Sequence, residues 1–166
     1  MGAFHLVLAF LVVQRLAELV LARRNTARLL AEGAVEHGRG HYPLFILLHG
    51  GWLLALALLA PADAAIHLPL FVVFVVLQLG RVWVITSLGR YWTTRIITVP
   101  DAPLVKRGPF RFVRHPNYMV VIGEIAVVPL MVGLWEVALV FSSLNLILLA
   151  WRIRAEEEAL APRRSG

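Results

Sequence analysis

The chain has 166 residues, of which 60% are hydrophobic and only 16% charged, and its formal net charge at pH 7 is +6. This composition is too apolar for an ordinary soluble protein and predicts one integral-membrane domain over residues 1–166. The absence of cysteine excludes disulfides, thiolate metal sites and a cysteine nucleophile. Because the cations lie beside hydrophobic segments, contact with membrane lipid explains them better than binding of nucleic acid.

Three stretches are long and apolar enough to cross a bilayer, which takes about 20 residues. They are residues 2–22, 42–60 and 66–88. The stretch 117–151 has room for two shorter spans, with a turn at residues 133–136. We therefore predict an all-α membrane protein of about five transmembrane helices. Residues 1–88 would hold three spans, and residues 89–166 a loop, a helical hairpin and a C-terminal helix.

Basic residues fall in three segments outside these spans, namely 23–41, 89–116 and the tail from 152. The connections 61–65 and 133–136 contain none. Because cytoplasmic loops carry an excess of Lys and Arg, this distribution places the three basic segments in the cytoplasm. The N-terminus is then expected outside and the C-terminus in the cytoplasm.

Polar side chains inside the expected spans fall at a common depth. At a rise of 1.5 Å per residue, five of them lie about 10 to 12 Å from the cytoplasmic ends of their helices. They are Arg15, His49, Gln78, Glu124 and Asn145. Such a layer either lines a reaction chamber or joins helices by hydrogen bonds. We favour helix bridging for His49 and Gln78, and a structural ion pair between Arg15 and Glu18.

Glu124 differs from the other members of this layer. No cation lies within a turn of it on its own helix, and an uncompensated carboxylate in a membrane is costly. It must be protonated, paired across helices or exposed to a wet cavity. Structural and catalytic roles are both open for it.

The segment 104–118 combines cations, a glycine and two prolines. Pro109 and Pro116 break regular structure, and Gly108 permits backbone conformations closed to other residues. Pro116 suits the first turn of a helix, whose free backbone N–H groups attract carboxylates. A loop that contacts lipid headgroups would explain the cations. The order Arg-His-Pro-Asn-Tyr at 114–118 favours a binding site instead.

The end of the last helix carries three glutamates, although a helix C-terminus disfavours anions. Arg152 and Arg154 each lie four residues before a glutamate and can pair with Glu156 and Glu158, which leaves Glu157 for a ligand. A solvated helix end is the alternative. The helical spacing of Ser142, Asn145, Leu149, Arg152 and Glu156 predicts a polar stripe that faces protein.

Residues 89–160 resemble the isoprenylcysteine carboxyl methyltransferase family, in particular its bacterial branch. The resemblance rests on the Gly-Pro-aromatic turn at 108–110, Arg-His-Pro-x-Tyr at 114–118, and the arginine and glutamate run at 152–160. It implies that S-adenosylmethionine binds on the cytoplasmic side, between the loop and the C-terminal helix. The residues implied to line that site are Gly108, Pro109, His115, Tyr118, Arg152 and Glu157. Arg114, or another loop cation, would orient the acceptor.

The resemblance implies a methyltransferase of the bacterial cytoplasmic membrane that converts S-adenosylmethionine to S-adenosylhomocysteine. The expected partner is a lipophilic acceptor that enters from the bilayer and is methylated on a carboxylate or on a phenol or enol hydroxyl. A hydroxyl acceptor benefits from a base, for which Glu124 and His115 are candidates. The alternatives are a non-enzymatic lipid-binding or assembly protein and a phospholipid N-methyltransferase.

Overall fold

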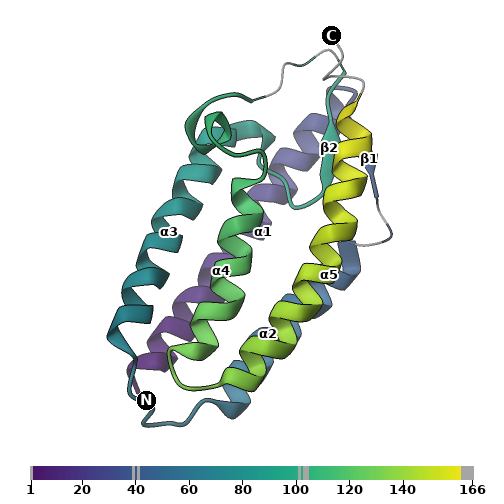
Figure 1. Cartoon of the computed structure of the whole chain (residues 1–166). Coiled ribbons are helices and arrows are strands. Elements are labelled where there is room, and N and C mark those ends of the chain that lie inside the picture. Colours follow the sequence, from purple (N-terminus) through teal and green to yellow (C-terminus); the bar gives the residue numbers. More distant parts are fainter. Residues whose placement is uncertain (1, 39, 41, 101, 103–104, 162–166) are drawn as a thin grey trace.

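The computed structural model describes residues 2–38, 40, 42–100, 102 and 105–161. Its helices run in chain order as α1 (Ala3–Ala31), α2 (Tyr42–Leu59), α3 (Leu68–Leu88), α4 (Pro116–Leu130) and α5 (Trp135–Leu160) (Figure 1). Four of these, α1, α2, α3 and α5, are long and apolar enough to cross a membrane, and α4 is a shorter apolar helix of 15 residues. The mostly helical membrane architecture is confirmed, with four candidate spans where about five are predicted.

Helix α1 continues to Ala31, well past the expected end of the first span at residue 22. The extension is held by packing, because Asn25 and Leu29 are buried. The amide of Asn25 donates a hydrogen bond to the carbonyl of Trp92, 2.8 Å away. A polar sequence is therefore helical here through tertiary contact.

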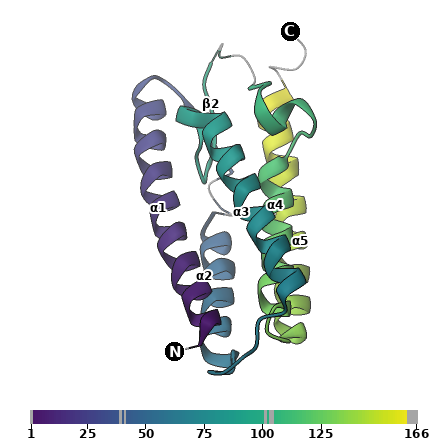
Figure 2. The same cartoon turned by 90° about the vertical axis from the view of Figure 1, so that its left-hand side faces the viewer.

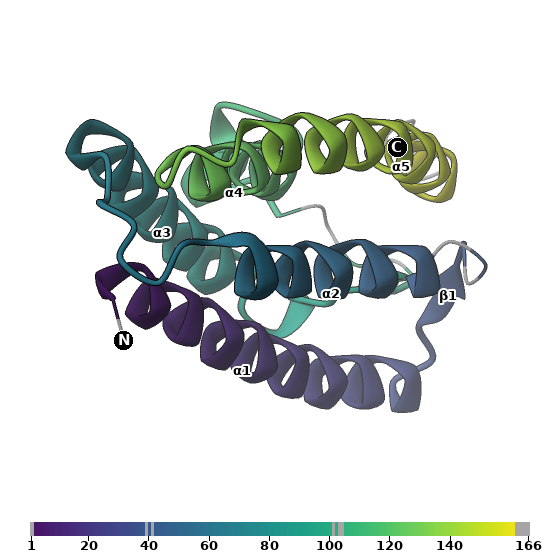
Figure 3. The same ribbon diagram turned by 90° about the horizontal axis from the view of Figure 1, so that it is seen from below.

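Helices α4 and α5 form the expected hairpin. Pro129 lies in the last turn of α4, and Gly133 follows with a φ of 77°, a value that favours glycine. The Leu134 amide closes the turn on the Pro129 carbonyl at 3.0 Å. Viewed from below, α4 and α5 lie side by side, α1 and α2 lie opposite them, and α3 packs against α4 at one edge (Figure 3).

A two-stranded antiparallel sheet is an element that the sequence did not predict. Strand β1 (Val35–His37) pairs with β2 (Ile96–Thr98), so that Glu36 lies opposite Ile97. Three residues per strand are too few for a recognisable alternation of polar and apolar side chains. The sheet packs beside the end of α5 (Figure 1).

The two ends of the bundle differ in charge. One end carries the N-terminus, the α2–α3 connection and the hairpin turn, and the other carries the sheet, the α3–α4 loop and the end of α5 (Figure 2). The three basic segments thus share one end of the molecule, as their expected common location requires. Arg39, Arg163 and Arg164, which contribute to those segments, lie outside the described residues.

A cluster of charged side chains joins three helices inside the bundle. Glu124 of α4 is fully buried and forms ion pairs with Arg15 of α1 and Arg81 of α3. Glu18 completes the set, with Arg15 at 2.7 Å and Arg81 at 3.5 Å. Gln78 also donates to Glu124 at 2.7 Å. This buried ion cluster of Arg15, Glu18, Arg81 and Glu124 has two positive and two negative groups, so Glu124 is paired across helices.

We predict that Arg81→Met lowers the stability of the protein by about 3 to 5 kcal/mol, because it leaves two buried carboxylates with one cation. The measurement is thermal unfolding in detergent micelles. Arg90→Met is the matched control, since it breaks an exposed pair with Glu32, worth about 0 to 1 kcal/mol. Equal losses in the two variants would contradict the structural role of the cluster.

Candidate functional site

A cavity of about 400 Å³ opens at the basic end of the bundle. Its walls come from residues 91–99 around β2, the loop before α4, the first turn of α4 and the last turns of α5. We call it the outer cavity. Of the residues assigned to a cofactor site from sequence, His115, Tyr118 and Arg152 line it, and Arg114 and Glu156 lie beside them in the same wall.

Gly108 and Pro109 are not among the described residues that line the outer cavity. They belong to a turn that packs against α3 and so set the shape of the loop. Gly108 has a φ of 58°, and a Cβ there would come within 1.9 Å of Ser87 Oγ. The neighbouring Arg107 Nε donates to the Ser87 carbonyl at 2.7 Å. These contacts hold the loop against the end of α3, and Phe110 then contributes to the cavity wall.

Tyr118 links the first turn of α4 to the end of α5. Arg152 Nε donates to the Tyr118 hydroxyl at 3.0 Å, and that hydroxyl donates to a carboxylate oxygen of Glu156. Arg152 Nη2 also donates to the Thr94 carbonyl at 2.8 Å. Tyr118 therefore stands between Arg152 and Glu156, where the sequence suggested a direct pair within the helix.

His115 packs flat on Tyr118, with ring centroids 5.4 Å apart. Its nitrogens lie 3.8 Å from Glu156 and 3.7 Å from Glu157. Glu157 is thus close to the loop, although Glu156 is the glutamate that faces the outer cavity. The glutamates and the loop are brought together as the motif order suggests.

A second cavity, of about 300 Å³, lies deeper between α1, α2, α4 and α5. Most of its lining is apolar, and we call it the inner cavity. Several of its residues are exposed on the outside of the bundle: Val12 and Leu16 of α1 at 38% and 59%, and Ile46 of α2 at 53%. The inner cavity therefore reaches the lateral surface between α1 and α2, two of the helices that are long and apolar enough to cross a membrane.

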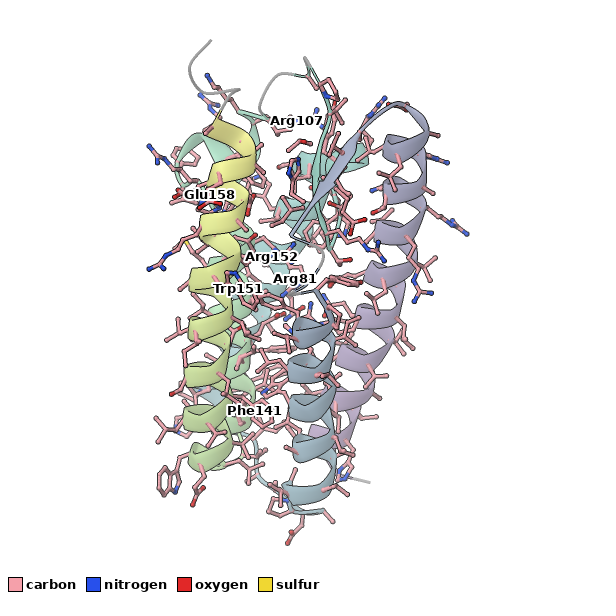
Figure 4. All side chains as sticks on the ribbon, turned by 90° about the vertical axis from the view of Figure 1, so that its right-hand side faces the viewer. Arg81, Arg107, Phe141, Trp151, Arg152 and Glu158 are labelled. Atoms are coloured by element: carbon pink, nitrogen blue, oxygen red, sulfur yellow. The ribbon has the colours of Figure 1, made fainter. Side chains whose placement is uncertain are left out.

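The two cavities share a wall. Five residues line both of them: Trp92, Thr93, Asn117, Tyr118 and Arg152. Figure 4 shows Arg152 of α5 and Arg81 of α3 at nearly the same height within the bundle. The Arg152 guanidinium also lies 5.3 Å from the ring of Phe45, which lines the inner cavity. Arg152 is consequently the charged group at the junction.

Three polar atoms at this junction, among the described residues, have no hydrogen-bond partner although they are buried. They are Trp92 Nε1, His115 Nε2 and Asn117 Oδ1, and all three residues line the outer cavity. A buried polar atom without a partner is costly. A ligand with both donor and acceptor groups fits this end of the cavity.

Glu124 lies outside this arrangement. Its two carboxylate oxygens are occupied by Arg15, Gln78 and Arg81, and it is absent from the described residues that line the two cavities. The geometry favours a structural role over proton transfer for this carboxylate. Of the expected polar layer, Arg15, Gln78 and Glu124 are joined, His49 lines the inner cavity, and Asn145 is buried on α5.

Two groups of the site were not identified from sequence. Arg81 is 1% exposed and is part of the inner wall; its position one helical turn after Gln78 was the available signal. Thr94, whose carbonyl binds Arg152, lies in a segment whose path depends on the unpredicted sheet. A main-chain acceptor of this kind has no sequence signal.

Comparison with known proteins finds a matching family model and similar bacterial proteins. The model of the isoprenylcysteine carboxyl methyltransferase family matches residues 69–162. The uncharacterized protein YpbQ of Bacillus subtilis strain 168 is 41% identical over 161 residues, which cover 95% of this chain and 96% of that protein. An uncharacterized protein of Haemophilus influenzae is 27% identical over 171 residues, with 95% and 94% covered. No solved structure matches the chain.

Proposed function

The chain belongs to the isoprenylcysteine carboxyl methyltransferase family, which indicates a membrane methyltransferase, and we propose that it methylates an oxygen of a lipophilic acceptor with S-adenosylmethionine. The observation that carries this proposal is the shared wall between a polar and an apolar cavity. Transfer between a water-soluble and a lipid-soluble reactant requires two sites of different polarity that meet at one point. Arg152 and Tyr118 mark that point.

S-adenosylmethionine fits the outer cavity by its chemistry. When bound, it supplies a methyl group on a positively charged sulfur. Its carboxylate suits Arg152 or Arg114, its amine suits Glu156, and the unpartnered Asn117 Oδ1 and His115 Nε2 offer further polar contacts. The aromatic residues Tyr91, Trp92 and Phe110 supply a surface for a planar base.

The lipophilic acceptor belongs in the inner cavity under this proposal. Its apolar tail would leave sideways between α1 and α2, past the exposed Leu16 and Ile46. Its head group would lie against Arg152 and Tyr118, where Trp92 and the packed helices exclude water. In-line displacement needs mainly such positioning and dryness.

The charges of the inner cavity favour a hydroxyl acceptor over a carboxylate. Arg15 and Arg81 line this cavity, but each is paired with Glu18 and Glu124. Their positive charge is therefore balanced within the wall. A carboxylate buried here would find Arg152 as its cation and would compete for it with the carboxylate of the cofactor. A neutral phenol or enol avoids this competition.

We assign Glu124 to the support of this chamber. By fixing Arg15 and Arg81, it sets the charge and shape of the inner wall without touching either reactant. His115 remains the candidate for accepting a proton on the side of the outer cavity.

We further propose that the basic end faces the cytoplasm, because cytoplasmic loops are enriched in Lys and Arg. The absence of cysteine makes the test direct. In intact cells, a membrane-impermeant maleimide should label Asp63→Cys in the α2–α3 connection and leave Arg107→Cys unlabelled until the cells are opened. The reverse pattern would contradict this orientation.

For the cofactor, we predict that S-adenosylhomocysteine binds the purified protein in detergent and that Arg152→Ala weakens this binding at least about tenfold, through loss of a charge-assisted contact. Isothermal titration calorimetry measures it. Arg154→Ala is the control, because Arg154 is exposed on the same helix, and it should bind like the wild type. Absence of binding to the wild type would favour a non-enzymatic membrane protein.

A further inference from the structure

His49 is a polar side chain on the wall of the inner cavity whose hydrogen bonding is incomplete. It belongs to α2 and is half-buried. Its Nδ1 lies 2.9 Å from the carbonyl oxygen of Phe45, one turn earlier on the same helix. The two rings are 6.5 Å apart, and both residues line the cavity.

The contact with Phe45 defines the form of the imidazole. A carbonyl oxygen can only accept a hydrogen bond, so Nδ1 must carry the hydrogen. Nε2 of the neutral ring is then an acceptor with a free lone pair. Within the part of the chain that the structure describes, Nε2 makes no hydrogen bond. The ring is thus oriented by its backbone contact and presents an acceptor.

Helix bridging does not explain this histidine. Gln78 shows what a bridging residue does here, since it accepts a hydrogen bond from Gln14 of α1 and donates one to Glu124 of α4. The hydrogen bond of His49 stays within α2. A polar side chain at membrane depth that joins no other helix points to a ligand or a water-filled cavity.

The polar groups around His49 define the chemistry of that ligand. Arg15, Glu18 and Arg81 line the same cavity, and their charges are balanced within the buried ion cluster. Glu18 is 8% exposed, and its Oε1 is buried without a hydrogen-bond partner. The unfilled positions on His49 and Glu18 are acceptors, whereas those on Arg15 Nε and Trp92 Nε1 in the same wall are donors. The complementary ligand is therefore a neutral group that both donates and accepts, as a hydroxyl does.

We propose that His49 is a specificity-determining residue, whose Nε2 accepts a hydrogen bond from the hydroxyl of a phenol, enol or alcohol in the inner cavity. The inference rests on the proposed function in one respect, which is that the lipophilic acceptor occupies this cavity. A carboxylate or an ether has no hydrogen to donate. A methyl ether, which is the product of the proposed reaction, offers no hydrogen to His49 Nε2 and is therefore held more weakly than the hydroxyl.

The test compares two probes of the same shape, 4-octylphenol and its methyl ether 4-octylanisole, with purified full-length protein in detergent and without cofactor. Binding is measured from the rise in unfolding temperature across a series of probe concentrations. The wild type should bind the phenol about two- to tenfold more tightly than the ether, as expected for one hydrogen bond.

Three variants separate recognition from a structural effect. His49→Leu should bind both probes equally. His49→Gln, which keeps an acceptor oxygen, should retain part of the preference. His37→Gln should behave like the wild type, because His37 binds Thr98 in the sheet and lies outside the residues that line the cavity. The ratio of the affinity for the phenol to the affinity for the ether is compared between variants, because a substitution that weakens both probes equally leaves this ratio unchanged.

A wild-type protein that does not distinguish the probes, or a His49→Leu variant that keeps the full preference, would overturn the inference. Because the assay needs neither cofactor nor turnover, its result is independent of the methyltransferase proposal. Loss of the preference in His49→Leu would support the inference even in a protein that fails to bind S-adenosylhomocysteine.

Discussion

The ion pairs of Glu124 with Arg15 and Arg81 are the interaction on which the rest of the structure depends. They connect α1, α3 and α4 at a depth where an isolated charge would be prohibitively expensive. They also place two arginines in the wall of a mostly apolar cavity, where Glu18 and Glu124 balance the charge of both. One set of contacts therefore fixes the helix arrangement and makes the chamber suitable for a neutral head group.

Arg152 lies in the wall that separates the two cavities of the protein. Its contacts with Tyr118 and the Thr94 carbonyl join α5, α4 and the segment before β2. The result is a polar cavity on one side and an apolar cavity on the other. Because both cavities reach Arg152 and Tyr118, a polar methyl donor and a lipid-borne oxygen can approach each other while each stays in surroundings of its own polarity.

The sequence predicted the parts of this arrangement that depend on hydropathy and local motifs. The three N-terminal apolar helices, the hairpin turn around Gly133 and the polar stripe on the last helix follow from hydropathy and spacing. The structure confirms the turn, the stripe and three helices long and apolar enough to cross a membrane. The proximity of the segment 114–118 to Arg152 was implied by the family resemblance. These features are set by contacts that are short in sequence or by strongly periodic patterns.

Contacts between distant segments were harder to predict. Glu124 had three possible states, and the positions of Arg15 and Arg81, 109 and 43 residues earlier in the chain, show that it is paired. His49 was expected to bridge helices, yet its hydrogen bond stays within α2. The sheet that positions Thr94 has strands too short to recognise. In each case the deciding partner lies far away in sequence or is a backbone atom, and neither leaves a pattern.

Transfer of an isotopically labelled methyl group tests the central claim most directly. Purified protein would be incubated with labelled S-adenosylmethionine and a mixture of 4-octylphenol, 4-octylbenzoate and phosphatidylethanolamine, and the lipids analysed by mass spectrometry. Two adjoining cavities with a neutral inner wall predict label in 4-octylanisole, with an equal amount of S-adenosylhomocysteine. Label on the amine of the phospholipid, or no label in any lipid, would contradict the account.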